Sequence, residues 1–192
     1  MIKNKLARIA ICTAVILIII PLAFSLYNTA VTEYYKRQYP LPDEYLDTIT
    51  KYSEQYSVPP ELICGVINTE SSFVKDAVSH AGAKGLMQIT GPTFEWIQYK
   101  LDEELSANEV FDIDTNIRYG TFLLSFLYSE FNNWDTALAA YNAGRNKVKD
   151  WLADESVSQD GVLVNIPYKE TADYVKKVAK AREYYAKNYF YE

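Results

Sequence analysis

The sequence has almost no cysteine or histidine, with only Cys12, Cys64 and His80 present. Cys12 falls in a long apolar run, so the rest of the chain cannot form an internal disulfide, and Cys64 is expected to be a small buried apolar residue. Two cysteines and one histidine cannot supply the four ligands of a structural zinc site. We therefore expect no metal site, and we expect His80 to be an exposed loop residue.

Basic residues are also scarce outside the first few positions. The chain carries 19 Lys and Arg against 25 Asp and Glu, a net charge of −6. The first thirty residues contain three basic residues and no acidic one, so the remainder carries −9. Such an acidic chain lacks the positive surface that binds nucleic acid or anionic lipid. Nucleic acid is therefore excluded as a partner.

One long hydrophobic run separates the beginning of the chain from the rest. About 18 uncharged residues from Ile9 can span a bilayer, whereas a signal peptide has an apolar region of about 7 to 15 residues and a small-residue cleavage site. No such site follows here. We predict a cytoplasmic N-terminus at 1–8 and an uncleaved signal anchor at 9–27, with everything after it outside, since the basic residues precede the run. A cleaved signal peptide is the alternative.

Helical signals dominate after this anchor. We expect a juxtamembrane linker at 28–42 that ends in a Pro-rich turn, and one all-α domain at 43–192, because no stretch alternates with the period of a strand. A helix is predicted at 43–56, and Ser57 is predicted to cap the next one. Further helices are expected to begin at Thr93 and at Pro167. An apolar helix is expected to be capped by Asp114 or Thr115, another to follow Asn133 or Asp135 and stop at Gly144, and a helix or turn is expected at 146–152.

The second of these helices ends in an acid that lies on its apolar side. Leu62, Ile63, Val66 and Ile67 precede Glu70 by eight, seven, four and three residues, the spacing of a core-facing stripe. Most glutamates at helix ends are solvated, whereas an acid in an apolar wall has a raised pKa. A carboxyl group that stays protonated near neutral pH suits general acid catalysis of glycosidic bond cleavage.

Four further motifs follow "ESSF" in order: "GAKGLMQIT", "DIDTNIRYGTFLL", "AAYNAG" and "IPYKETADYV". Each one alone is weak, but the set in this order resembles the soluble lytic transglycosylase domain (glycoside hydrolase family 23), which is related to goose-type lysozyme. The resemblance extends from about Asp43 to the C-terminus. It implies a lysozyme-like helical domain with a substrate cleft.

The resemblance also implies roles for individual residues. Glu70 matches the catalytic acid, and no cofactor is implied. The matching substrate-binding positions are Ser71 beside the acid, Ser79 in the following loop, Gly85, Met87 and Gln88 in the Gly-Leu-Met-Gln loop, Tyr141 and Asn142 of "AYNAG", and Glu170 of "ET". Two positions depart from the family pattern, Thr90 in place of a frequent methionine and His80 in place of a frequent proline, which leaves the subsite preference open.

The activity implied is that of a peptidoglycan lytic transglycosylase, which cleaves the β-1,4 bond between MurNAc and GlcNAc and forms 1,6-anhydro-MurNAc. The expected partners are peptidoglycan glycan strands, and the expected state is a monomer on the cell-wall side of a bacterial membrane. A muramidase that hydrolyses the same bond and a non-catalytic peptidoglycan-binding module are the alternatives. The presence of Glu70 argues against the non-catalytic module, because a binding domain needs no acid in an apolar wall.

Overall fold

A computed structural model describes residues 2–190 and, within the first helix, the side chains of Thr13 and of residues 15–38. Met1, at the start of the expected cytoplasmic segment, and residues 191–192, at the end of the expected domain, lie outside the described residues. The chain forms two compact units, Met1–Tyr39 and Pro40–Glu192. Each unit is described by itself.

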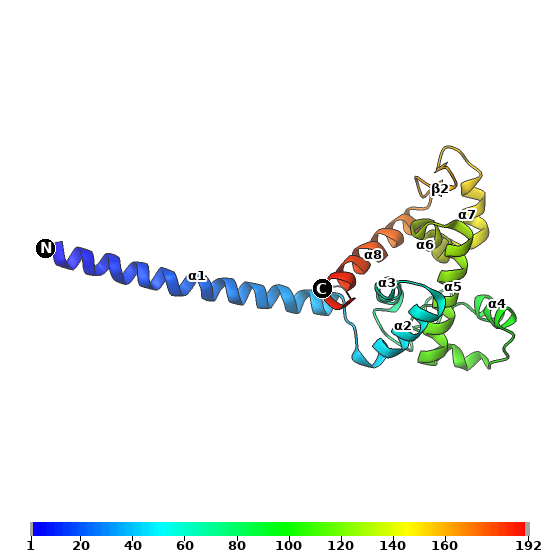
Figure 1. Ribbon diagram of the computed structural model, residues 1–192, viewed down its shortest axis with the longest axis horizontal. Helices are drawn as coiled ribbons and strands as arrows, with labels where there is room; N and C mark the ends of the chain where they lie inside the picture. Colours follow the sequence, from blue (N-terminus) through cyan, green and yellow to red (C-terminus); the bar gives the residue numbers. More distant parts are fainter. Residues whose placement is uncertain (1, 191–192) are drawn as a thin grey trace. The chain divides into compact units, whose positions relative to one another are not determined.

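The first unit is a single helix, α1 (Ile2–Gln38), in blue in Figure 1. Its part Val15–Gln38 is long and apolar enough to cross a membrane. Most of the expected linker 28–42 is helical, because no proline or glycine occurs between residue 28 and Pro40. The helix ends where the residue before Pro40 is sterically disfavoured from helical geometry.

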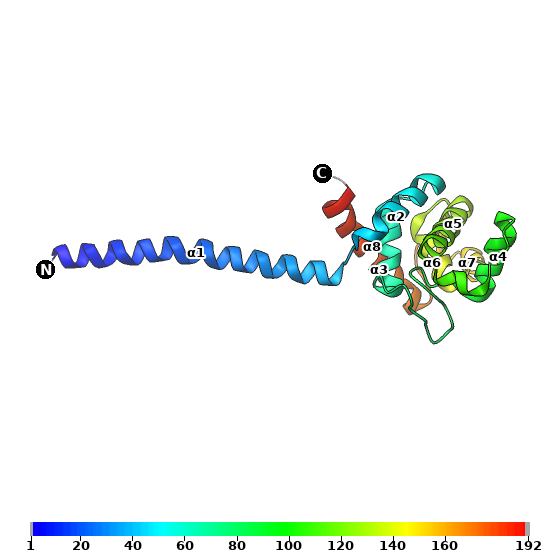
Figure 2. The same cartoon turned by 90° about the horizontal axis from the view of Figure 1, so that it is seen from below.

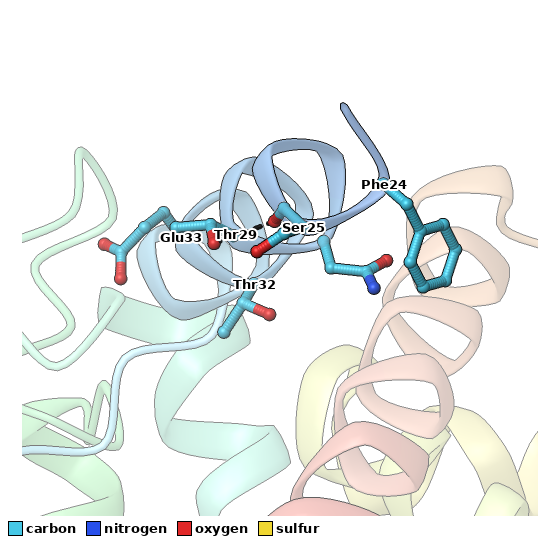
Figure 3. A pocket seen from close by; sticks show the side chains of 6 residues that line it. Phe24, Ser25, Thr29, Thr32 and Glu33 are labelled. Atoms are coloured by element: carbon cyan, nitrogen blue, oxygen red, sulfur yellow. Dashed lines mark hydrogen bonds between the residues drawn. The ribbon is translucent and has the colours of Figure 1, made fainter. Parts of the chain in front are cut away.

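One face of α1 carries polar side chains at helical spacing, beside a shallow hollow lined by Phe24, Ser25, Thr29, Thr32 and Glu33 among others (Figure 3). The Thr29 hydroxyl donates to the Ser25 carbonyl at 3.0 Å. Such a bond to the preceding turn satisfies the hydroxyl within the helix. This hydroxyl therefore needs no partner outside α1, which suits an apolar surrounding.

The second unit confirms the all-α prediction. Its α-helices are α2 (Asp43–Tyr56), α3 (Pro60–Ser71), α4 (Gly91–Leu101), α5 (Ile113–Phe131), α6 (Trp134–Ala143), α7 (Arg145–Leu152) and α8 (Lys169–Tyr185). A 3-10 helix, η1 (Ala107–Phe111), precedes α5, and a π-helical turn, η2 (Ala186–Phe190), follows α8. In both views α3 lies beside α8, with α6 next to them (Figures 1 and 2).

The packing of α3 on α8 places the end of α3. A Cβ at Gly65 would lie 3.0 Å from the backbone oxygen of Val178, so glycine permits a close approach of the two helices. Nearer the start of α3, the carboxylate of Glu61 pairs with Arg182 at 3.1 Å. Position 61 thus meets 182 and position 65 meets 178, so the helices run antiparallel. The last turn of α3 therefore points toward the first half of α8.

The stripe predicted on α3 is part of the core. Leu62, Ile63, Val66 and Ile67 are fully buried, and Cys64 is a free, fully buried thiol, as expected. Burial of this stripe removes apolar surface from water and so holds α3 in the core. The gain in free energy is roughly 25 cal/mol per Å² of apolar surface buried.

A second apolar cluster holds α4 and η1 against α5. It contains Ile89, Phe94, Ile97, Val110 and Tyr119. These residues fix the end of the loop between α3 and α4, because Ile89 belongs to that loop. The loop and α5 therefore form one packed region.

Several helix ends differ from the predictions. Ser57 was expected to cap α3, but it is the left-handed C-cap of α2, with φ of 54°, and Pro59 takes the N-cap position. The helix after it therefore starts at Pro60, where a missing N–H costs nothing. The predicted caps Asn133 and Gly144 of α6 are confirmed; the Asn133 side chain accepts from Thr136 N at 2.9 Å.

Three other predicted starts or caps are wrong by two to three residues. α4 is capped by the Thr90 side chain, which accepts from the N–H of Thr93. α5 is capped by Asp112, which accepts from Thr115 N at 2.9 Å, and α8 begins two residues after Pro167. Adjacent Thr and Asp residues offer equivalent caps in sequence, and tertiary packing selects among them.

The only strands in the described part of the chain are β1 (Ser158–Gln159) and β2 (Val162–Leu163), which pair antiparallel. Asp160 and Gly161 connect them with φ of 51° and 77°. Two consecutive positive φ angles are typical of a type I′ turn, and Asp-Gly is a preferred pair for it. The hairpin joins α7 to α8 in Figure 1.

Candidate active site

Glu70 lies in the last turn of α3. The residue as a whole is half-buried, but its carboxyl end is the desolvated part, and this burial raises its pKa to about 7. The hydroxyl of Tyr174 on α8 faces the carboxyl and lowers this pKa in part. Because a neutral acid is favoured there, Glu70 can hold a proton near neutral pH.

Two tyrosines from different helices flank this carboxyl. Tyr141 of α6 and Tyr174 of α8 both have pKa values well above the usual range, mainly because their hydroxyls are buried and also because the charge of Glu70 opposes a second negative charge. Both hydroxyls therefore remain donors. The Tyr141 hydroxyl donates to the Met87 carbonyl at 2.7 Å. The buried Tyr174 hydroxyl faces Glu70 but makes no hydrogen bond of ordinary geometry within residues 2–190.

The loop after α3 turns back toward Glu70. It begins at Ser72 and Phe73, which have φ of 51° and 63°. Phe73 is buried and packs on the rings of Tyr45 and Tyr185, at centroid distances of 6.0 and 6.2 Å. The Ser71 hydroxyl, next to the acid, donates to the Leu86 carbonyl at 2.8 Å. The predicted neighbour of the acid thus ties the returning loop to the end of α3.

Gly85 and Asn116 fix the returning part of this loop. Gly85 has φ of 79°, and a Cβ there would lie 2.2 Å from Nδ2 of Asn116. Buried Asn116 on α5 donates to the Lys84 and Val110 carbonyls at 3.1 and 2.6 Å, and it accepts from Met87 N at 2.8 Å. Sequence reasoning missed Asn116, although an amide in the apolar phase of "NIRYGTFLL" was an available signal.

Met87 and Gln88 take different positions. The Met87 side chain is fully buried and packs on α5 where Gly120 leaves room, so its link to the site is the carbonyl that Tyr141 binds. Gln88 has φ of 49°, and its Nε2 donates to the carbonyls of Gly85 and Ala77 at 2.9 and 3.2 Å. Its amide nitrogen thus closes the loop on itself, and its Oε1 accepts no hydrogen bond within residues 2–190.

The remaining expected residues lie at exposed positions. Asn142 accepts a hydrogen bond from the Thr171 hydroxyl at 2.8 Å, which joins the end of α6 to the first turn of α8, where Glu170 is exposed. Ser79 is exposed in a tight turn, and its hydroxyl accepts from Ala83 N at 3.0 Å. Within residues 2–190, Ser79 makes no hydrogen bond to Glu70. His80 is exposed in the same turn, as expected.

The site has the chemistry of a single acid. Among the described residues, no second carboxylate is close enough to shift the pKa of Glu70. In the same part of the chain, no three His, Cys, Asp or Glu side chains form a group that could hold a metal ion. The arrangement therefore offers one proton donor, two neutral phenols and a loop of backbone carbonyls and amides.

Comparisons with known proteins identify relatives of this domain. The Transglycosylase SLT domain family matches residues 47–162. The soluble lytic murein transglycosylase of Escherichia coli (strain K12) is 33% identical over 149 residues, which cover 75% of this chain and 23% of that protein. The membrane-bound lytic murein transglycosylase C of Actinobacillus pleuropneumoniae serotype 5b (strain L20) is 30% identical over 166 residues, which cover 74% of this chain and 46% of that protein.

Solved structures agree with this result. The 70-kDa soluble lytic transglycosylase in complex with bulgecin A matches with a TM-score of 0.73 and 27% identity, over 85% of this chain and 27% of that chain. An inactive glutamate-to-glutamine mutant of lytic transglycosylase Slt from Pseudomonas aeruginosa matches with a TM-score of 0.69 and 32% identity, over 78% of this chain and 24% of that chain.

This chain spans between 23% and 46% of the length of these curated relatives. The matched range includes Glu70, the loop that returns to it and Tyr141. Since the match covers more than half of the chain, the chain belongs to the Transglycosylase SLT domain family.

Proposed function

We propose that this protein is a peptidoglycan lytic transglycosylase. The observation that carries the proposal is a desolvated Glu70 with a pKa of about 7, which no second carboxylate of residues 2–190 shifts. The names of the relatives support the substrate, because they are lytic murein transglycosylases. The inactive Pseudomonas aeruginosa mutant supports a requirement for one glutamate in that relative.

In the first step, the protonated Glu70 donates its proton to the glycosidic oxygen between MurNAc and GlcNAc. The C1–O bond breaks, GlcNAc leaves with a new hydroxyl, and an oxocarbenium-like or N-acetyl-assisted intermediate remains on MurNAc. Burial of the carboxyl serves this step, because it keeps the proton on Glu70 at neutral pH.

In the second step, the Glu70 carboxylate accepts the proton of the C6 hydroxyl of the same MurNAc. The C6 oxygen then bonds to C1 and closes the 1,6-anhydro ring, which returns Glu70 to its protonated form. The nucleophile belongs to the substrate, so no water and no second carboxylate are needed. The Tyr174 hydroxyl, which faces Glu70, is placed to donate to the carboxylate formed between the two steps.

The other expected residues have supporting roles in this proposal. Gln88 would present Oε1 to the sugar, and Tyr141 would hold the loop through the Met87 carbonyl. Ser71 would keep that loop beside the acid. Asn142 and Glu170 would contact the glycan at the exposed junction of α6 and α8, and Ser79 would contact it from the loop turn.

The alternatives predict different products. A hydrolysing glycosidase generally uses a pair of carboxylates, and the surroundings of Glu70 do not favour this. Incubation of the full chain with purified sacculi, followed by mass spectrometry, separates the three functions. Anhydro-MurNAc products support the proposal, reducing MurNAc ends indicate a muramidase, and binding without products indicates a non-catalytic module.

We further propose that α1 anchors the protein by a single pass, with Pro40–Glu192 on the cell-wall side. The basic residues before the apolar run and the membrane-bound relative support this placement. Protease digestion of intact spheroplasts tests it, because only an external domain is cleaved. Light scattering of the detergent-solubilised chain tests the expected monomer.

A further inference from the structure

The helices α3 and α8 pack antiparallel in one defined register. Three contacts mark it along the interface: Arg182 with Glu61, Val178 with Gly65, and Tyr174 with Glu70. At a rise of 1.5 Å per residue, Arg182 lies about 12 Å from Tyr174 along α8, and Glu61 lies about 13.5 Å from Glu70 along α3. The two lengths nearly match, so the contact near the start of α3 determines which residue of α8 reaches Glu70.

The middle of this interface is apolar. Val175 and Val178 on α8 are buried, and Gly65 on α3 permits a close approach to the Val178 backbone. Apolar burial is non-directional, so it holds the two helices together without specifying one register by itself. A directional contact between α3 and α8 is suited to select that register.

The ion pair near the start of α3 is such a contact. Oε1 of Glu61 accepts from Nη2 and Nε of Arg182 at 3.1 and 3.2 Å, and the Glu61 side chain is only 4% exposed. Separation of a buried carboxylate from its cation is strongly unfavourable, so the pair opposes a displacement of α8 along α3. The specification of register is the best-attested use of buried ionic groups.

Two further side-chain bonds of α8 lead to other segments. The Thr171 hydroxyl bonds to Asn142 at the end of α6, and the Tyr185 hydroxyl bonds to the Pro40 carbonyl. Both bonds hold α8 within the second unit, but neither of them reaches α3. The ion pair therefore links the two helices that meet at the candidate acid.

We propose that Glu61 and Arg182 are positioning residues of the candidate active site. Their ion pair fixes the register of α8 on α3 and thereby holds the Tyr174 hydroxyl against the Glu70 carboxyl. The pair acts through Tyr174, about 12 Å farther along α8, and not by contact with the glycan. This inference rests on the proposed function, because it gives the pair a role in the reaction of Glu70.

The protonation of Glu70 reports on this register. Two ionisable side chains interact with Glu70 within residues 2–190, Tyr174 of α8 and Tyr141 of α6. Tyr141 is tied to the Met87 carbonyl, and this bond does not involve α8. A shift of α8 should therefore remove the effect of Tyr174, which lowers the pKa of Glu70, and leave the effect of burial, which raises it. The midpoint of Glu70 should then move to higher pH.

The test separates register from stability with two variants of the full chain in mild detergent. Arg182→Met leaves the buried Glu61 without this cation, so its melting temperature should fall. Glu61→Leu combined with Arg182→Met removes both charges. This double variant should regain the melting temperature, because apolar side chains of similar volume often replace a buried ion pair without loss of stability.

Both variants should raise the alkaline midpoint of kcat/KM on sacculi. The expected shift is roughly half to one pH unit, the effect of one hydrogen bond to a charged group. Lys169→Met is the matched control, since it removes an exposed ion pair with Asp173 that lies within α8 and does not involve α3. It should change the melting temperature little and leave the midpoint unchanged.

A ¹³C-carboxyl NMR titration of Glu70, assigned by comparison with Glu70→Gln, measures the same midpoint without a substrate. An unshifted midpoint in the double variant, once its melting temperature has recovered, would overturn the inference, because a purely stabilising ion pair gives that result. If the unmodified chain forms no anhydro-MurNAc from sacculi, the proposed function fails. The NMR comparison then still decides whether the pair positions Tyr174.

Discussion

At the scale of single residues, the protonation of Glu70 sets the expected pH dependence. Its pKa of about 7 lies above the reference value of 4.5, because burial disfavours the charged form. The first catalytic step needs the proton. We therefore expect kcat/KM on sacculi to fall on the alkaline side with a midpoint near pH 7. A profile that stays flat from pH 6 to 9 would contradict the role of Glu70 as the acid.

The same shift affects stability. A carboxyl whose pKa is raised in the folded state contributes stability that is present below the unfolded pKa and is lost as the pH rises through about 7. Glu70→Gln removes this loss. The melting temperature of the variant minus that of the unmodified chain should therefore be larger at pH 8 than at pH 5. A difference that does not change with pH would show that Glu70 is not buried as described.

Glu70→Gln should also abolish most of the activity. The amide keeps the shape of the side chain but can neither donate nor accept the proton, so we expect a loss of roughly two to four orders of magnitude in kcat. Binding to sacculi, measured by cosedimentation, should remain. Near-normal turnover would exclude the single-acid mechanism.

Tyr174→Phe tests the residue that sequence reasoning did not select. Its hydroxyl lowers the pKa of Glu70 and has no ordinary hydrogen bond within the described residues. Its removal should therefore change the melting temperature little, lower kcat and move the alkaline midpoint to higher pH. Tyr185→Phe on the same helix is the control, since it loses a 2.7 Å bond to the Pro40 carbonyl. That variant should lose about 1 kcal/mol of stability without a shift in midpoint.

At the scale of elements, the loop between α3 and α4 depends on two glycines of different kinds. Gly85→Ala would place a methyl group 2.2 Å from the Asn116 amide at φ of 79°. We expect a loss of more than about 2 kcal/mol in unfolding free energy, together with a loss of activity, because backbone strain and overpacking add. Chemical denaturation measures it.

Gly82→Ala is the control for this effect. Gly82 has a similar φ of 78°, but no heavy atom lies within 4 Å of an added Cβ. Only the backbone strain remains, so the cost should be about 1–2 kcal/mol. Equal effects of the two variants would mean that the Asn116 contact does not hold the loop.

The elements also show where local sequence signals are sufficient. The helix at 43–56 and the stop at Gly144 were predictable, because amphipathic spacing and a glycine after a helix act locally. Ser57 was assigned to the wrong helix, because a serine between two helices can serve either end. The hairpin at Asp160 and Gly161 was overlooked, although the Asp-Gly pair is a known signal for it.

At the scale of the whole molecule, the division at Pro40 makes a prediction about solubility. A chain that begins at Pro40 retains the complete second unit. We expect it to be soluble, to keep the melting temperature of that unit and to cleave purified sacculi. The full chain should sediment with membranes because of the apolar stretch in α1.

Two results would contradict this division. Membrane association of the shortened chain would place the anchor outside α1. Release of the native protein from membranes as a shortened chain would mean that the first segment is a cleaved signal peptide, so N-terminal sequencing of the native protein is the deciding measurement.

The sequence by itself determined the helical class, the apolar first segment and the identity of the candidate acid, because hydrophobic spacing and ordered motifs are local properties of the chain. Only the tertiary structure decided what surrounds that acid. The desolvation of Glu70, the approach of Tyr174 from α8 and the anchoring of the loop by Asn116 each depend on residues more than 25 positions apart. Met87 shows the same limit, because its burial against Gly120 follows from how the loop packs on α5 and not from its motif. Contacts of this kind form only when helices pack, so no local pattern specifies them.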